Sequence, residues 1–243
     1  MSYEIFAKVY DEFMEDTPYN KWCENLEYIW NKHNKKPKLI LDLGCGTGTI
    51  TTMLAKKGYD LIGVDLSYDM LMEAKSKNSN ILYLNQDMRN FELYGTVDVI
   101  YSLCDSLNYI LEIEELIQIF KLVNNYLNPK GLFIFDMNTE YKFKKLGSQN
   151  FGSNTKKGSY IWENYYDEKD KINEYYTTIF IKEGKYYKKY EEEHYEKAYT
   201  IEEIKDAIEK SGLEFLYVLD EHLKEVRENS ERIYFVCSEK GKR

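Results

Sequence analysis

The sequence is poor in residues that cross-link a chain or bind metals. It contains four cysteines, three histidines and three prolines among 243 residues. No two cysteines stand at metal-ligand or redox spacing, since they fall at Cys23, Cys45, Cys104 and Cys237. We therefore expect no metal site, no disulfide framework and a reducing, cytoplasmic location.

The sequence also lacks a long apolar run and an excess of positive charge. No stretch reaches the roughly 18 consecutive apolar residues of a membrane span, and residues 1–6 do not read as an export leader. Acidic residues outnumber basic ones by 42 to 33, which gives a net charge of −9. Because nucleic-acid affinity depends largely on Lys and Arg at the phosphates, we expect a soluble protein that binds neither nucleic acid nor membrane.

The most informative feature is a glycine-rich turn. Residues 42–48 read Asp-Leu-Gly-Cys-Gly-Thr-Gly, and they lie between the apolar run 39–41 and a helical pattern over residues 50–55. A strand that enters such a turn and leaves as a helix places bare backbone and N–H groups against a ligand. This arrangement predicts a cofactor site.

The spacing of the glycines distinguishes two kinds of cofactor. A dinucleotide site needs a third glycine at position 49, where this chain has Thr49. The glycines fall instead at Gly44, Gly46 and Gly48, which resembles the first motif of class I S-adenosylmethionine-dependent methyltransferases. A nicotinamide-dependent oxidoreductase is therefore the least favoured alternative.

Acidic residues end the next two strand-like runs. Asp65 comes 65 − 44 = 21 residues after Gly44, close to the spacing of about 20 that places a carboxylate on a ribose diol. Asp87 follows the run 81–86. Aspartates are common in loops simply because their side chains stabilise turns. Three acids in register with a glycine turn, Asp42 included, nevertheless favour a nucleoside site.

The resemblance implies a role for each of these residues. In the family, the acid at Asp87 hydrogen-bonds the adenine amino group, Met88 packs on the ring, and Asp42 faces the methionine ammonium group. S-adenosylmethionine is thus the expected cofactor. The other residues expected to contact it are Tyr10, Tyr19, Trp22, Cys45, Thr47, Leu66, Met70 and Leu103.

Apolar strands that alternate with helices predict the fold. We expect an α/β protein with a doubly wound, mostly parallel seven-stranded sheet of the Rossmann-like methyltransferase type. A helix from the capping box Thr200–Glu203 to Gly212, followed by an antiparallel strand pair, completes it. The expected strands are 39–43, 61–64, 81–84, 97–103, 132–136, 214–219 and 232–236, with helices over 47–57, 67–76 and 113–126.

The remaining segments flank this core. Residues 1–36 predict two amphipathic helices that form a lid, the second with Thr17 as N-cap and Pro18 as its first residue. Packing of these helices on the sheet is the alternative. Residues 150–199 predict an inserted antiparallel β ribbon. We expect one domain, 1–243, with a core of 37–140 and 200–243, as a monomer or homodimer.

Few catalytic groups are expected, because S-adenosylmethionine carries an activated methyl group and alignment is the main task. His194, near the end of the ribbon, is the candidate general base, and an ordinary ribbon histidine is the alternative. Cys104 lacks the preceding proline of cytosine methylators and reads as a small core residue. Residues 136–139 could orient an amine or a hydroxyl group, and the alternative is that Asp136 caps the loop.

These features together predict methyl transfer to a nitrogen or oxygen of a small-molecule acceptor by in-line displacement. The loop 102–109 resembles that of methyltransferases for small metabolites and amino sugars, and it lacks the Pro-Pro-aromatic motif of nucleic-acid amine methylators. Two alternatives stay open. One is a methyltransferase of the same fold for tRNA, rRNA or protein, and the other is a non-catalytic scaffold that uses the tyrosine-rich ribbon as an interface.

Overall fold

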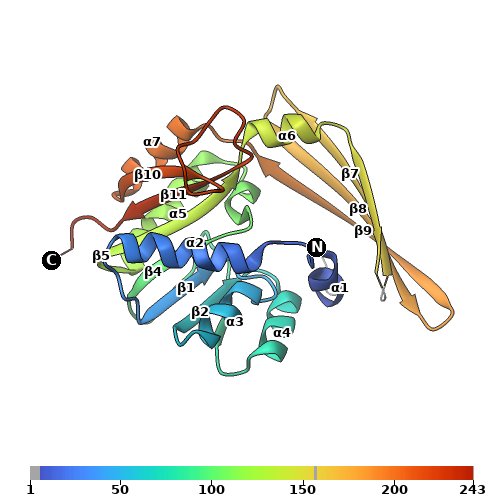
Figure 1. The fold of residues 1–243 in the computed structure, drawn as a ribbon, viewed down its shortest axis with the longest axis horizontal. Coiled ribbons are helices and arrows are strands. Elements are labelled where there is room, and N and C mark those ends of the chain that lie inside the picture. Colours follow the sequence, from blue (N-terminus) through green and yellow to red (C-terminus); the bar gives the residue numbers. More distant parts are fainter. Residues whose placement is uncertain (1–5, 156–157, 243) are drawn as a thin grey trace.

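The computed structural model describes residues 6–155 and 158–242, so the parts of the predicted lid and ribbon in residues 1–5 and 156–157 lie outside the described residues. The larger of two sheets has seven strands (Figure 1). Its strands are β1 (Leu39–Leu43), β2 (Asp60–Asp65), β3 (Leu82–Asn85), β4 (Val97–Ser102), β5 (Leu127–Asn138), β10 (Glu214–Asp220) and β11 (Arg232–Ser238).

The strand order is β10-β11-β5-β4-β1-β2-β3, and the five strands from β5 to β3 run parallel. Strand β11 is antiparallel to both β5 and β10. The prediction of a doubly wound, mostly parallel, seven-stranded sheet is confirmed. Because the parallel strands all end at one edge, the loops that follow them meet there.

Helices cover both faces of this sheet. They are α2 (Tyr19–Lys32), α3 (Thr49–Lys56), α4 (Tyr68–Lys77), α5 (Ile113–Tyr126) and α7 (Ile201–Ser211). Two shorter helices, α1 (Phe6–Phe13) and α6 (Glu140–Leu146), contact α4 and the second sheet, respectively. Along β1, Ile40 packs with α2 and α3, whereas Leu41 packs on the opposite face with α5 and α7. Such alternation into two apolar clusters explains why four of the five residues of β1 are apolar, the exception being the buried Asp42.

Helix α2 belongs to the core layer. Trp22, Leu26 and Trp30 lie in one cluster with the sheet residues Tyr101 and Ile134. The prediction of its N-terminus is wrong, because Pro18 is the N-cap and no side chain caps the helix. A backbone hydrogen bond from Tyr19 N–H to the Thr17 carbonyl, 2.8 Å long, turns the chain there instead.

Local signals place the C-terminal helix correctly. The capping box is present, with the Thr200 hydroxyl accepting the Glu203 N–H and the Glu203 carboxylate accepting the Thr200 N–H. Gly212 ends the helix at φ +86°, a left-handed conformation that glycine adopts without a Cβ penalty. No helix in residues 6–155 and 158–242 combines the length and apolarity needed to cross a membrane.

The second sheet is antiparallel and extends to one side of the core (Figure 1). It contains β6 (Asn150–Asn154), β7 (Gly158–Asp167), β8 (Ile172–Glu183) and β9 (Tyr186–Lys197), in that order. Helix α1 packs between this sheet and the core, where Val9 joins Met70 of α4 and Ile179 of β8 in one apolar cluster. The sheet therefore comes near the carboxyl edge of the parallel strands.

Candidate active site

The glycine-rich turn joins β1 to α3 in a conformation that only glycine adopts without strain. Gly44, Gly46 and Gly48 have φ of +84°, +53° and +67°. The N–H groups of Gly44 and Cys45 donate to the Val64 carbonyl at 2.8 and 3.0 Å, which ties the turn to the end of β2. A Cβ placed on Gly46 would meet no atom within 4 Å. The backbone at Gly46 thus faces open space, as a cofactor cradle requires.

The other two glycines allow close packing. A Cβ on Gly44 would lie 2.9 Å from Ser106 Oγ and 3.3 Å from Met88 Cε. A Cβ on Gly48 would lie 2.7 Å from the Tyr83 hydroxyl. Met88, predicted to face the adenine ring, therefore lies beside the first glycine of the turn.

Asp65 lies at the end of β2, directly beside the turn. Its Oδ2 accepts the Gly46 N–H at 2.7 Å, and its Oδ1 accepts the Ser67 N–H at 2.8 Å. Burial raises the pKa of this carboxyl, and the two N–H donors oppose that shift. Each carboxylate oxygen can accept a further hydrogen bond. The side chain is therefore held in one orientation and retains acceptor capacity for a diol.

Asp42 is a buried anchor within β1. Its Oδ2 accepts hydrogen bonds from the hydroxyl groups of Thr51 of α3, at 2.5 Å, and Tyr101 of β4, at 2.7 Å. Burial raises the pKa of the carboxyl to about 7, although these two hydrogen bonds lower it. The Asp42 carboxyl group thus links β1, the strand before the turn, to α3, the helix after it.

The raised pKa of Asp42 predicts a pH effect on stability. An unfolded aspartate titrates near pH 4 (about 3.9), so between that value and about 7 the folded state holds a proton that the unfolded state has lost. This contribution makes the wild-type protein less stable as pH rises through that window. Asp42→Asn should remove this pH dependence, which amounts to a few kcal/mol in the free energy of unfolding between about pH 4 and 7. Urea unfolding of both proteins at several pH values measures it. The same dependence of the unfolding free energy on pH in the two proteins would contradict the assignment.

Asp87, after β3, has a strong partner of its own. The Arg89 guanidinium contacts both of its oxygens, and the Arg89 backbone N–H donates to Oδ1 at 2.9 Å. These bonds lower the pKa of the Asp87 carboxyl. Arg89 is itself held by Glu115 of α5 at 2.9 Å. The hydrogen bond predicted between Asp87 and the adenine amino group stays a prediction.

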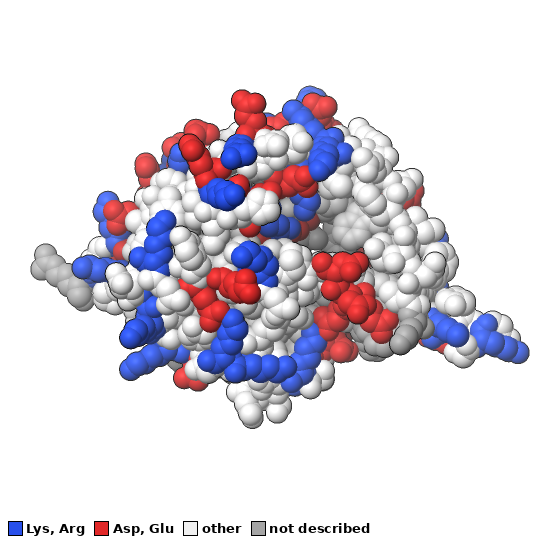
Figure 2. All heavy atoms as spheres, in the orientation of Figure 1, with Lys and Arg blue, Asp and Glu red and all other residues white. Residues whose placement is uncertain are grey.

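Helix α1 contacts the turn through an acid that the sequence did not indicate. Asp11 accepts hydrogen bonds from the hydroxyl groups of Thr47, at 2.7 Å, and Thr49, at 3.3 Å. It also forms an ion pair with Lys77 of α4. Figure 2 shows acidic side chains gathered over α1 and the segment after it. Nothing in an amphipathic pattern marks one exposed acid of a short helix as a contact to a turn about 36 residues away.

The aromatic residues expected to contact the cofactor lie on one side of the turn. The Tyr10 hydroxyl is 4.0 Å from Cys104 Sγ, and the Tyr19 ring meets the Trp22 ring edge-on at 5.6 Å. Trp22 is buried beneath the Arg232 guanidinium, 5.0 Å from its ring centre. These residues lie beside the loops that follow β4 and β5.

The predicted apolar contacts are spread more widely. Met70 lies in the cluster with α1, and Leu103 is buried with the α2 layer. Leu66 has 66% of its surface exposed. Cys45 packs above Gly63, where a Cβ would come within 2.8 Å of its sulfur. Of this set, Leu66 alone projects mainly into solvent.

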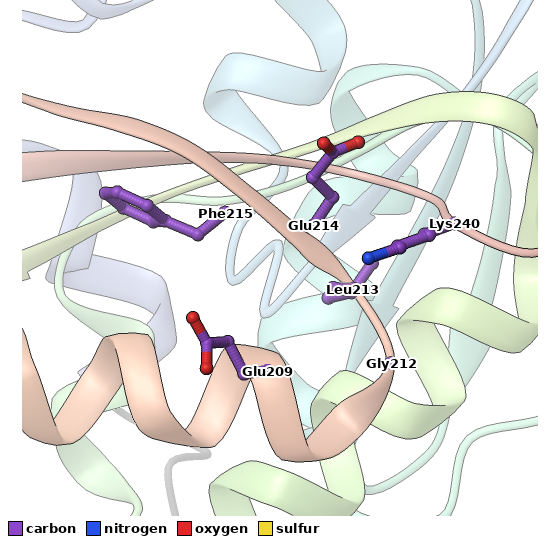
Figure 3. A pocket seen from close by; sticks show the side chains of 6 residues that line it. All are labelled: Glu209, Gly212, Leu213, Glu214, Phe215 and Lys240. Atoms are coloured by element: carbon purple, nitrogen blue, oxygen red, sulfur yellow. The ribbon is translucent and has the colours of Figure 1, made fainter.

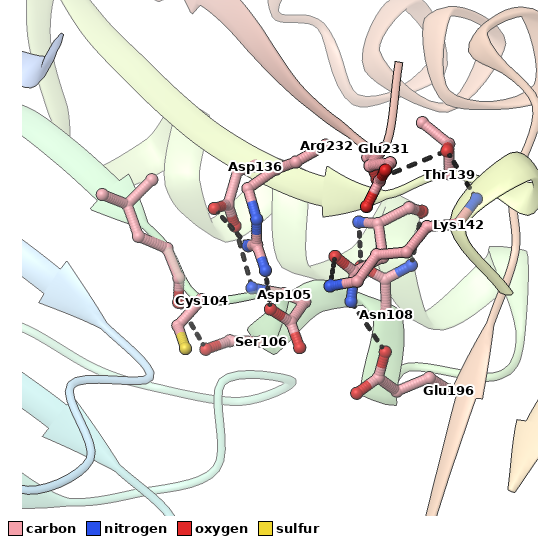
Figure 4. Close-up of polar contacts among 12 residues, drawn as sticks. Cys104, Asp105, Ser106, Asn108, Asp136, Thr139, Lys142, Glu196, Glu231 and Arg232 are labelled. Carbon is pink, nitrogen blue, oxygen red and sulfur yellow. Dashed lines mark hydrogen bonds and ion pairs between the residues drawn. The ribbon is translucent and has the colours of Figure 1, made fainter. Parts of the chain in front are cut away.

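A second group of polar residues lies at the carboxyl ends of β4 and β5 (Figure 4). We call Asp105, Asp136, Glu196, Arg232 and Lys142 the carboxylate cluster. Arg232 bridges Asp136 and Asp105 at 2.5 Å each, and Asp136 also accepts the Asp105 N–H at 2.8 Å. Backbone strain accompanies it, since Cys104 and Asp105 have φ of +63° and +53° without being glycine.

Asn138 connects this cluster to the inserted sheet. Its Nδ2 donates to Glu196 of β9 at 3.2 Å, and its Oδ1 accepts from Lys142 of α6 at 2.8 Å. The Tyr175 hydroxyl of β8 donates to the same Glu196 oxygen at 3.4 Å. The prediction that residues 136–139 could orient an acceptor group therefore concerns a segment joined to charged side chains from three elements.

His194, the candidate base, lies on the same face of β9 as Glu196. It is 8% exposed, its Nε2 is 3.3 Å from Glu192, and its ring meets that of Tyr109 edge-on at 5.9 Å. Tyr109 belongs to the 3-10 turn η1 (Ser106–Tyr109) in the loop after β4. A role as base stays a prediction.

An open recess of about 560 Å³ lies away from all of these residues (Figure 3). It is formed by the end of α7, the start of β10 and Lys240, and two glutamates line it. It lies where β10 begins and β11 ends, and β11 is antiparallel to β5. This is the amino edge of the parallel strands, so the recess has no part in the site at their carboxyl edge.

Comparison with known proteins identifies relatives along the whole chain. A family described as "Methyltransferase domain" matches residues 40–131. The Bacillus subtilis (strain 168) protein named "Putative methyltransferase YqeM" is 34% identical, and the alignment covers 97% of this chain and 96% of that protein. The crystal structure of a S-adenosylmethionine-dependent methyltransferase from Clostridium acetobutylicum ATCC 824 is 33% identical, with a TM-score of 0.87 and coverage of 98% and 99%.

A more distant relative acts on an amino sugar. The dTDP-3-amino-3,4,6-trideoxy-alpha-D-glucopyranose N,N-dimethyltransferase of Streptomyces venezuelae is 28% identical over 55% of this chain and 58% of that protein.

Proposed function

Because the chain belongs to the S-adenosylmethionine-dependent methyltransferases, we propose that it transfers a methyl group to a nitrogen or oxygen atom of a small-molecule acceptor by in-line displacement. S-adenosylmethionine, the cofactor of the family, supplies a methyl group activated by its sulfonium charge. The protein's task is then to align the acceptor with that group and to exclude water.

The cofactor assignment to particular residues rests on the open backbone at Gly46. Asp65, fixed by two N–H donors beside Gly46, would accept both ribose hydroxyls, since its carboxylate oxygens have further acceptor capacity. Asp87 and Met88 would meet the adenine, and Asp42 would favour the amino-acid ammonium. Tyr10, Tyr19 and Trp22 would enclose the bound molecule from the side of α1 and α2.

A small molecule is the acceptor that the charge distribution favours. The net charge is −9, and Figure 2 shows basic side chains over the lower left of the core and at the distal tip of the hairpin β8–β9, whereas acidic side chains gather over α1. A groove for RNA needs a continuous basic track at the reacting centre. The distant amino-sugar methyltransferase is consistent with this choice. Cytoplasmic location and a monomeric or homodimeric state belong to the same proposal.

The acceptor can be identified with a methyl-labelled cofactor. The protein is incubated with labelled S-adenosylmethionine and a metabolite extract, and the products are separated by mass. We expect label in a low-molecular-weight product. Label in tRNA, rRNA or protein instead would overturn the small-molecule assignment, and tight cofactor binding without any transfer would favour a scaffold.

A matched pair of glycine variants tests the cradle. Gly46→Ala and Gly58→Ala each add one methyl group at a positive φ, and neither Cβ would meet an atom within 4 Å. Each should cost about 1–2 kcal/mol of stability, because alanine avoids this conformation. Gly46→Ala alone should also weaken S-adenosylhomocysteine binding, by roughly tenfold or more in calorimetry, since the methyl group would occupy the ligand's place. Equal affinities of the two variants would contradict the cradle.

A further inference from the structure

The carboxylate cluster has more acids than bases. Arg232 pairs with Asp105 and Asp136, and the charge of Lys142 acts on Asp105 and Glu196, so the acids outnumber the cations by one among these five described residues. Asp136 and Glu196 are almost fully buried. An unmatched charge in such surroundings is costly, so the cluster favours taking up one positive charge.

In the unliganded protein a proton supplies that charge. The carboxyl groups of Asp105 and Glu196 are hydrogen-bonded to each other. Two carboxyl groups share such a bond only when one of them carries a proton. Arg232 lowers the pKa of Asp105, while burial and the charge of Asp105 raise the pKa of Glu196 well above its ordinary value. The shared proton therefore belongs mainly to Glu196.

The pair lies where an acceptor has to bind. The Asp105 side chain is 16% exposed, whereas Glu196 lies buried behind it on the inserted sheet. Asp105 follows Cys104, whose sulfur is 4.0 Å from the Tyr10 hydroxyl of α1. The next residue along α1, Asp11, contacts the glycine-rich turn. A ligand between the turn and the inserted sheet would thus reach Asp105 first.

We propose that the Asp105–Glu196 pair recognises an amino group, so that the methyl acceptor is an amine that binds in its ammonium form. This inference rests on the proposed methyltransferase function and narrows its substrate class. An ammonium group can replace the shared proton without changing the cluster's charge, and it donates hydrogen bonds to both carboxylates. A hydroxyl group cannot supply the charge.

The exchange conserves protons. When the ammonium group binds, Glu196 releases one proton to solvent, and the ammonium group takes its place. Before the nitrogen can act as a nucleophile, one of its N–H bonds must break, and an O–H bond then forms on the Asp105–Glu196 pair. The pair thereby returns to its singly protonated state, and the amine has an available lone pair.

Charged and titratable groups from every neighbouring element face the pair. They are Arg232 of β11, Asp136 of β5, Lys142 of α6, Tyr175 of β8, Tyr10 of α1 and Cys104 of the loop after β4. The two cations hold Asp105 ionised, and the other groups are neutral or paired with Arg232.

Infrared spectroscopy of the full chain tests the proposal, with methylammonium chloride as the probe. At neutral pH we expect carboxylic-acid carbonyl absorption from both Asp42 and Glu196, and Glu196→Gln should remove only the Glu196 component. Methylammonium should bleach that same component in the wild type, whereas sodium chloride or methanol at equal concentration should not. Glu239→Gln, which makes the same change at a buried carboxyl outside both the pair and the cofactor site, should keep the methylammonium response.

The contrary results are equally distinct. A Glu196 component that persists at the highest methylammonium concentration the folded protein tolerates would overturn the proposal, as would equal bleaching by sodium chloride or absorption unaffected by Glu196→Gln. Calorimetry with S-adenosylhomocysteine on the same samples separates the two levels. If Glu196→Gln binds S-adenosylhomocysteine, the variant is folded. If the wild type does not bind it, the proposed function is refuted, and the infrared result alone then decides whether the Asp105–Glu196 pair binds an ammonium group.

Discussion

Replacing Asp65 with alanine should weaken S-adenosylhomocysteine binding by at least about 100-fold, because two hydrogen bonds from ribose hydroxyls to a charged acceptor are lost at about 1.5–3 kcal/mol each. The substitution also releases the Gly46 N–H, which donates to Asp65 at 2.7 Å, so the turn loses one of its anchors. Isothermal titration calorimetry measures the affinity directly.

Asp60→Ala is the matched control for this experiment. Asp60 lies in the same strand as Asp65 but at its opposite, exposed end. We expect this variant to bind S-adenosylhomocysteine as the wild type does. Undiminished affinity of Asp65→Ala, or an equal loss in both variants, would remove Asp65 from the cofactor site.

Arg232→Met should destabilise the protein by about 3–5 kcal/mol, because it leaves Asp105 and Asp136 without their shared partner in a buried site. Methionine keeps apolar contact with the Trp22 ring beneath it. Chemical denaturation at neutral pH measures the loss.

The loss should also depend on pH. Without the guanidinium, burial raises the folded-state pKa of the two carboxyls, so the variant is relatively most stable below the unfolded pKa of about 4 and weakens as pH rises. The gap to the wild type should therefore narrow in acid. Arg227→Met removes an exposed arginine of the preceding loop and should change stability by less than about 0.5 kcal/mol. A similar small effect of Arg232→Met would mean that the cluster does not depend on this ion pair.

Features that the sequence predicted well are specified by neighbouring residues. The capping box at Thr200 and Glu203 spans one helical turn, and Gly212 ends that helix through its own backbone freedom. The turn at Gly44, Gly46 and Gly48 likewise follows from local conformation. The strands were predicted because burial on both sheet faces leaves a continuous apolar run.

Features that were missed depend on tertiary structure. Arg232 meets Asp105 and Asp136 across 127 and 96 residues, so only the antiparallel pairing of β11 with β5 brings them together. Glu196 reads as one more glutamate of an acidic strand. Helix α6 is seven residues long and begins at a Thr139 cap, too short for a periodic pattern to stand out.

The tyrosines of the inserted sheet illustrate the same limit. Alternation along a strand predicts that neighbours face opposite sides, but it does not say which side is buried. In the structure Tyr175 points inward to Glu196, whereas Tyr176 lies outward with 39% of its surface exposed. That assignment is made by the contact between the sheet and the loops after β4 and β5.

A crystal structure of the protein with S-adenosylhomocysteine tests the central claim most directly. We predict the ligand's ribose hydroxyls on the Asp65 carboxylate and its amino-acid end against the backbone at Gly46. Density for the nucleoside at another place, or an empty turn at saturating ligand, would contradict the account.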